Sequence, residues 1–206
     1  MLAPPRQPWT EVDAKAAHRP ARLPDGIGAV DASEVHPVIS RATAAMRIKF
    51  ITTGGTIDKV YFDAKSEYEV GPPQVAGLLR EANVTFEFEV EAVLHKDSLD
   101  LTDADRELIR ARIAADTSTG IVVTHGTDTM IQTALVLRGI PDKTVVLTGS
   151  MQPARFRVTD AEFNLGAAVA AVQTLPPGVY IAMNGRVFDP ARSRKNAAHH
   201  CFEEIA

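Results

Sequence analysis

Cysteine is nearly missing from this sequence of 206 residues, because Cys201 is the only one. A single cysteine excludes an internal disulfide and any cysteine-rich metal cluster. No CxxC pattern accompanies Cys201, so we interpret it as a residue without a role in the chemistry. A reducing, cytoplasmic location fits this composition.

Several other features are also lacking. The longest apolar runs, such as residues 166–172, fall far short of the roughly 20 residues that span a bilayer. The net charge of −4 gives no general attraction to nucleic acid or to an anionic membrane. Neither GxGxxG nor GxxxxGK[ST] occurs, which disfavours nucleotide binding. We therefore expect neither a nucleic-acid partner nor a membrane association.

The first 45 residues differ from the rest of the chain. They hold six of the thirteen prolines, and no helical or strand period persists in them. Such a segment buries too little apolar surface to offset its ordering entropy. We expect residues 1–45 to be a disordered or weakly ordered extension, or residues ahead of the true start, and residues 46–206 to form one domain that begins at Met46.

From Met46 onward, apolar runs typical of strands alternate with helical patterns. Repeated βα units predict a single α/β domain with three layers and a doubly wound, largely parallel sheet of the Rossmann or flavodoxin-like kind. Residues 58–71 have mixed polarity and indicate a flexible loop or a short hairpin. The expected strands cover 47–52, 85–93, 120–124, 143–148 and 179–183, and the expected helices cover 72–82, 103–115, 128–137 and 159–173, with Thr102/Asp105 and Thr159/Glu162 as capping pairs.

Two strand ends carry hydroxyl-rich motifs. Thr-Gly-Gly-Thr at 53–56 follows the first strand, and His-Gly-Thr-Asp-Thr at 125–129 follows the third. Each is ambiguous alone: the first could be a plain tight turn, and Asp128 could simply cap a helix. His125 precedes its turn and is interpreted as a core histidine. Parallel sheets bind ligands at the carboxyl ends of their strands, so a shared site depends on whether these two ends meet.

Taken together, four motifs are far more specific than either alone. Residues 52–57, 97–102, 125–129 and 147–153 occur in this order, each after a predicted strand. In this respect the sequence resembles the N-terminal domain of bacterial-type L-asparaginases and glutaminases, over about residues 46–200. The resemblance implies that five residues are catalytic: Thr56, Tyr68, Thr127, Asp128 and Lys195. It also implies that the substrate is bound by Asp97, Ser98 and Asp128.

The implied chemistry is amide hydrolysis. A free threonine hydroxyl is a poor nucleophile, so a phenolate or a neutral lysine must take its proton. Backbone N–H groups of the glycine-rich turn and of Thr127 are candidate donors to the oxyanion of the tetrahedral intermediate. The resemblance calls for no metal and no cofactor. The open alternative for Lys195, in a basic stretch near the end, is a solvated surface loop.

The resemblance also implies a second domain, which full-length members carry and which completes the pocket from a neighbouring subunit. This sequence ends at Ala206, so we expect an open pocket unless another copy covers it. We expect threonine-dependent hydrolysis of a small amide such as L-asparagine; the alternative is a non-catalytic module that binds a small amino acid or dicarboxylate.

Assembly is the last expectation from the sequence. Soluble oligomers most often close by two-fold symmetry, and exposed apolar patches mark their interfaces. We expect a homodimer or homotetramer with the 152–157 loop near the contact, where Arg155 and Arg157 either reach a neighbour's pocket or only solvate the loop. The apolar residues expected at this surface are Met151, Phe156, Val158, Phe163 and Phe188.

Overall fold

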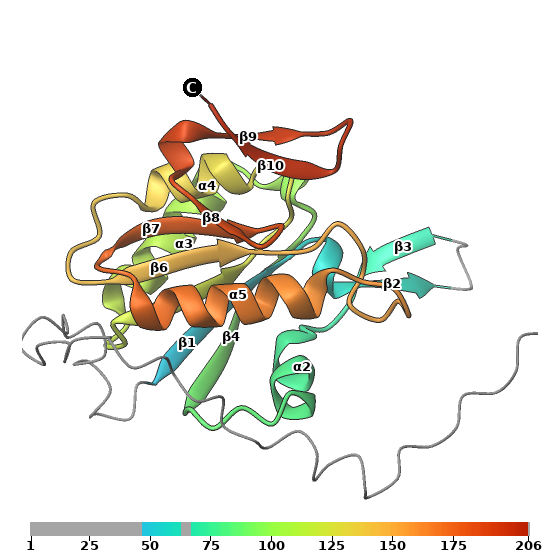
Figure 1. The fold of residues 1–206 in the computed structure, drawn as a ribbon, viewed down its shortest axis with the longest axis horizontal. Helices are drawn as coiled ribbons and strands as arrows, with labels where there is room; N and C mark the ends of the chain where they lie inside the picture. Colours follow the sequence, from blue (N-terminus) through green and yellow to red (C-terminus); the bar gives the residue numbers. More distant parts are fainter. Residues whose placement is uncertain (1–46, 63–66, 206) are drawn as a thin grey trace, which may run out of the picture. The chain divides into compact units, whose positions relative to one another are not determined.

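The computed structural model describes residues 47–62 and 67–205 (Figure 1). The predicted extension over residues 1–45 and the predicted start at Met46 lie outside the described residues. Among those described, no helix combines the length and the apolar composition that a membrane crossing requires.

The core of the domain is a six-stranded sheet with the order β4-β1-β5-β6-β7-β8. Five strands run parallel, and the short edge strand β8 is antiparallel to β7. The largely parallel α/β sheet predicted from the sequence is therefore confirmed. The strands are β1 Ile48–Gly54, β4 Phe88–Lys96, β5 Gly120–Thr124, β6 Thr144–Thr148, β7 Gly178–Met183 and β8 Arg186–Phe188.

Helices cover both faces of this sheet (Figure 1). Alternate side chains of β1 show the division: Ile51 packs in a cluster with α3 (Asp103–Ala115) and α4 (Met130–Leu137), whereas Phe50 packs in a cluster with α2 (Val75–Glu81) and α5 (Ala161–Thr174). Two buried clusters on opposite faces of one sheet make the three layers expected for a doubly wound domain.

Several local predictions need correction. The helix expected from residue 72 begins at Val75, and the helix expected from residue 128 begins at Met130. The strand expected over 85–93 is β4, which covers Phe88–Lys96 and so begins and ends three residues later. The capping box of Thr102 and Asp105 is confirmed. The Thr159/Glu162 cap is wrong, because the N-cap of α5 is Asp160, and the Thr159 hydroxyl accepts a hydrogen bond from the N–H of Ala161.

The remaining elements are small. Residues 58–71 contain a short hairpin, one of the two alternatives predicted, formed by β2 (Lys59–Phe62) and β3 (Glu67–Val70). Two further features were not predicted from the sequence: strand β8, and the C-terminal hairpin of β9 (Ser193–Asn196) and β10 (Cys201–Glu204). The described residues also form three single-turn 3-10 helices: η2 Thr56–Asp58, η3 Ser98–Asp100 and η4 Pro190–Arg192.

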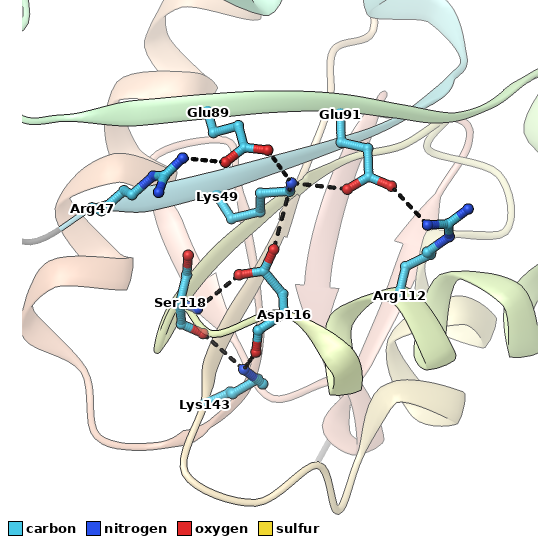
Figure 2. Close-up of polar contacts among 8 residues, drawn as sticks. All are labelled: Arg47, Lys49, Glu89, Glu91, Arg112, Asp116, Ser118 and Lys143. Carbon is cyan, nitrogen blue, oxygen red and sulfur yellow. Dashed lines mark hydrogen bonds and ion pairs between the residues drawn. The ribbon is translucent and has the colours of Figure 1, made fainter.

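A charged network holds the strands together away from the motifs (Figure 2). The ammonium of Lys49 on β1 lies 2.7 Å from Glu89 and 2.8 Å from Glu91, both on β4, and 3.5 Å from Asp116 after α3. Its side chain is only 5% exposed. Although burial opposes the charge, the hydrogen bonds to the two glutamates raise the pKa of Lys49 above its ordinary value. The network therefore links the strand pair β1–β4 to α3.

Candidate active site

The loops after β1 and β5 meet at the carboxyl edge of the sheet. Gly54 and Gly55 have φ values of +95° and +86°, a conformation that favours glycine. A Cβ on Gly55 would lie 2.4 Å from the backbone nitrogen of Gly126, so a side chain there would prevent the contact. Thr56 follows directly and begins η2. The contact brings the two hydroxyl-rich motifs into one site.

Ser98 lies against the same contact. A Cβ on Gly126 would lie 2.5 Å from the Ser98 hydroxyl, which is buried. Within the described part of the chain, this hydroxyl has no hydrogen-bond partner. The Thr129 hydroxyl donates to the Ser98 carbonyl at 2.7 Å and so fixes the serine to the β5 loop. A buried polar atom without a partner is costly, and a ligand oxygen could satisfy it.

Thr127, Asp128 and Lys195 come together at this edge. The ammonium of Lys195 lies 2.7 Å from the Thr127 hydroxyl and 2.6 Å from a carboxylate oxygen of Asp128. Thr127 is buried, and the Lys195 side chain is 19% exposed. Lys195 belongs to strand β9 and is paired, in contrast to the solvated-loop alternative. Asp128 does not cap α4, because the N-cap is Thr129.

His125 is the core histidine that the sequence indicated. It is fully buried, and its ring nitrogens contact the Gly126 carbonyl at 2.7 Å and the Thr133 hydroxyl at 2.8 Å. Burial lowers the pKa of His125 to about 4, so the ring is neutral at physiological pH. Both nitrogens of this neutral imidazole are bonded, and it holds the Gly126 carbonyl, next to Thr127 in the chain.

Tyr68 is the predicted site residue with the weakest connection to the others. Its ring lies 5.3 Å from that of Tyr61 and 5.7 Å from that of Phe156, measured between centroids, and it is half exposed. Among the described residues, the structure shows no hydrogen bond between Tyr68 and Thr56. Tyr68 thus belongs to an aromatic group that Tyr61 and Tyr68 of the hairpin form with Phe156 of the loop after β6.

Asp97 is bound within the protein. Its carboxylate lies 2.7 Å from the ammonium of Lys59 and accepts the N–H of Leu99 at 3.1 Å. Although partial burial opposes its charge, these donors hold the pKa of Asp97 below its ordinary value. Asp97 therefore shapes the Ser98 turn and stays ionised.

Three residues at the site were missed in the sequence. Lys59 pairs with Asp97, Thr129 holds Ser98, and Asp58 accepts hydrogen bonds at the end of η2. Asp58 directly follows the Thr-Gly-Gly-Thr-Ile motif, and this adjacency was the available signal. The pairings of Lys59 and Thr129 join distant segments and leave no local pattern.

One predicted surface residue is corrected by the structure. Phe188 is buried against Phe202 of β10, with ring centroids 6.2 Å apart, and cannot belong to an exposed patch. Met151 is partly buried against the core. Phe156, Val158 and Phe163 are exposed. The described residues contain no group of three or more His, Cys, Asp or Glu side chains placed to hold a metal ion.

The fold and the site define a three-layer α/β domain with a polar site at the carboxyl ends of parallel strands, where such sheets bind ligands. Residues 47–205 match the family described as Asparaginase, N-terminal. The chain therefore belongs to the asparaginase family.

Individual relatives agree with this assignment. The chain is 36% identical over 163 residues to L-asparaginase 2 of Escherichia coli, covering 72% of this chain and 46% of that protein. It is 32% identical over 164 residues to L-asparaginase of Thermococcus kodakarensis, covering 73% and 48%. The crystal structure of L-asparaginase I from Vibrio cholerae matches with a TM-score of 0.69 and 32% identity, covering 78% and 52%. The chain thus spans about half the length of the curated relatives it matches.

Proposed function

We propose that this chain is an amidohydrolase domain that hydrolyses a small amide, such as L-asparagine, to the acid and ammonia. The observation that carries the proposal is the contact of the Lys195 ammonium with the Thr127 hydroxyl and the Asp128 carboxylate, beside Thr56 and the buried Ser98 hydroxyl. A lysine paired with a hydroxyl can relay a proton between an attacking oxygen and a leaving nitrogen. Membership of the asparaginase family supports the same reaction class.

The proposed reaction has two halves. A threonine hydroxyl, Thr56 in our assignment, attacks the amide carbon. The Lys195 side chain, through the Thr127 hydroxyl, gives a proton to the leaving nitrogen, and the proton released by Thr56 replaces it. The C–N bond breaks, ammonia leaves, and an ester remains. Water then attacks the ester carbon, releases the acid and returns the proton to the threonine oxygen. Backbone N–H groups of the facing turns are candidate donors to the oxyanion in each half.

Substrate recognition uses the remaining polar groups. The unpartnered Ser98 hydroxyl is available to a substrate carboxylate. The Asp128 side chain is half exposed and keeps acceptor capacity for a substrate ammonium beside its bond to Lys195. This pair of groups is complementary to an amino acid amide.

Ammonia release from L-asparagine, L-glutamine and a panel of simple amides tests the proposal. The expected result is release that depends on enzyme concentration and is lost in Lys195→Ala. If no amide releases ammonia while titration calorimetry detects binding of L-asparagine or L-aspartate, the chain is a binding module and the proposal is wrong.

We also propose that the chain acts as a homodimer or homotetramer in the cytoplasm. The high exposure of Val158 and Phe163 supports the assembly, because large exposed apolar side chains can be buried at an interface. The free thiol of Cys201 is compatible with a reducing compartment. Size measurement and fractionation of the native cells test these two statements.

A further inference from the structure

Asp58 is a buried carboxyl in the turn that carries Thr56. It ends η2, two residues after Thr56, and only 2% of it is exposed. One carboxylate oxygen accepts the backbone N–H of Gln74 at 2.8 Å. The carbonyl of Asp58 accepts the N–H of Gly71 at 2.7 Å, and its own N–H donates to the Gly55 carbonyl at 3.1 Å. One residue thus joins the Thr56 turn to the segment that follows the β2–β3 hairpin.

The fit at this junction is tight. A Cβ on Gly71 would lie 2.9 Å from the side chain of Val60 on β2 and 3.1 Å from the Asp58 carbonyl oxygen. The two ends of the hairpin therefore close directly over the backbone of Asp58. A shift of Asp58 would move the hairpin, which carries Tyr68 and Lys59, relative to Thr56.

A second pair of contacts extends the junction to the loop after β6. The side-chain oxygen of Gln74 accepts from Arg155 at 3.0 Å, and the N–H of Ala154 donates to the Ile57 carbonyl at 3.2 Å. Two segments distant in sequence, 71–74 and 154–155, are thus held to one turn. Asp58 contacts the first segment, and Gln74 of that segment contacts the second.

The chemistry of this position is unusual for a purely structural acceptor. Burial raises the pKa of Asp58 to about 6, although the Gln74 N–H and the charge of His95 oppose that rise. At neutral pH the protein therefore buries an ionised group, which is costly. An amide oxygen would accept the same hydrogen bond without a charge, so the acceptor and the charge can be separated by mutation.

We propose that Asp58 is a positioning residue, which holds the Thr56 turn in its reactive orientation through the hydrogen bond to Gln74. The inference rests on the proposed amidohydrolase function. Reactions that depend on orientation are sensitive to small displacements, and a shift of about 1 Å can cost roughly 10²-fold in rate. Ser98 and Asp128 lie on other loops, so substrate binding should change less than turnover.

The test compares Asp58→Ala, which removes the acceptor, with Asp58→Asn, which keeps it. We expect Asp58→Ala to lower kcat by about 10- to 100-fold with KM changed by less than about threefold, and Asp58→Asn to retain kcat within about threefold. Full activity in Asp58→Ala would overturn the proposal. Equal losses in both variants would also overturn it, because the Gln74 bond would then not be the cause.

Two additions keep the test decisive. If Asp58→Ala does not fold, Gln74→Pro removes the donor instead, since proline is tolerated at the start of a helix. The same loss of kcat is expected, and an unchanged kcat contradicts the proposal.

Hydrogen–deuterium exchange is independent of activity. In Asp58→Ala, the amides of residues 67–74 and 152–157 should exchange faster than in wild type, while those of β5 should not. In Asp58→Asn, all of these rates should equal those of wild type. Wild-type protein without ammonia release would refute the function alone, whereas unchanged exchange in Asp58→Ala would refute the positioning role.

Discussion

The ammonium of Lys195 lies 2.7 Å from the hydroxyl of Thr127, although 68 residues separate the two in sequence. The position of Lys195 depends on its partner strand: Phe202 on β10 pairs with it across the hairpin and is buried against Phe188. The N–H of Phe202 also donates to the side chain of Asn184 at 2.9 Å. The hairpin is therefore fixed to the edge of the sheet, and the lysine is held on it.

Lys195→Ala should lose amide hydrolysis by about 10²-fold or more, because proton transfer by a positioned side chain contributes this much. The matched control is Arg194→Ala on the same strand, whose side chain is exposed and pairs with Glu203. It should keep activity within about twofold. Initial rates of ammonia release, with the fold monitored by circular dichroism, give the comparison. Equal rates for Lys195→Ala and wild type would contradict the role of the lysine.

Thr127→Ala should abolish hydrolysis while the melting temperature changes little. The Thr127 hydroxyl contacts Lys195 at 2.7 Å, and its methyl group adds little to the core. Thr127→Ser keeps the hydroxyl and should retain part of the rate.

Thr56→Ala should be inactive, since loss of a nucleophile typically costs orders of magnitude. An active Thr56→Ala with an inactive Thr127→Ala would assign the nucleophile to Thr127.

The parallel sheet and the motif turns could be predicted because their signals are local. Apolar strand runs, and glycines such as Gly54 and Gly55 with positive φ, leave a pattern within a few residues. Strand β9 has the sequence Ser-Arg-Lys-Asn, which shows no apolar alternation. Its existence depends on the burial of Phe202, a long-range contact, so the paired Lys195 could be proposed only from the family resemblance.

Other errors have similar physical causes. Helix α4 begins two residues later than expected because tertiary contacts hold the two preceding side chains in the loop: Asp128 pairs with Lys195, and Thr129 donates to the Ser98 carbonyl. Phe188 was expected on the surface because neither β8, which contains it, nor β10, which covers it with Phe202, was predicted. In each case a tertiary contact decided between alternatives that local sequence left equal.

Lys49→Met should destabilise the protein by about 1–3 kcal/mol, since it leaves the carboxylates of Glu91 and Asp116 without their shared partner. Arg47→Met is the matched control: it removes a cation that also pairs with Glu89 but is more than half exposed, so its effect should stay within about 0.5 kcal/mol. Urea unfolding at pH 7 measures both. Similar values for the two variants would show that burial of Lys49 adds nothing.

The same network predicts a loss of stability in acid. Hydrogen bonding to Lys49 lowers the pKa of Glu89 in the folded protein, so its contribution is present above the ordinary glutamate pKa and is lost as pH falls through the lowered value. The free energies of unfolding of wild type and Lys49→Met should therefore become more similar as the pH falls below about 4. A constant difference between them down to pH 2 would contradict this.

Asp58→Asn should stabilise the protein at neutral pH. Burial raises the pKa of Asp58 from 3.8 to about 6, so the folded state binds its proton more tightly than the unfolded state. The contribution of this group to stability therefore falls as pH rises from about 4 to 6 and stays low above that range. At pH 7.5 the variant should exceed wild type by about 1–3 kcal/mol, and the difference should shrink toward pH 5. A variant less stable than wild type at pH 7.5 would refute the assigned cost of the buried charge.

The last prediction concerns assembly. Val158, which is 81% exposed, and Phe163 follow the 152–157 loop, and the ring of Phe156 within this loop packs on the ring of Tyr68. Burying these side chains between two copies would remove apolar surface from water, at roughly 25 cal/mol per Å². Arg155 donates to Gln74 of its own chain, so Arg157 is the better candidate to reach a neighbour.

Light scattering at micromolar concentration should give two or four times the chain mass of 22.2 kDa. Val158→Glu places a charge in the proposed contact and should shift the protein toward the single-chain mass, because an unpaired buried charge is costly. The matched control, Leu135→Glu, alters another exposed apolar residue, on α4, and should leave the mass unchanged. If both variants and wild type have the single-chain mass and wild type hydrolyses amides, one domain forms a working pocket by itself, and the exposed apolar side chains must be explained by contact with a different partner.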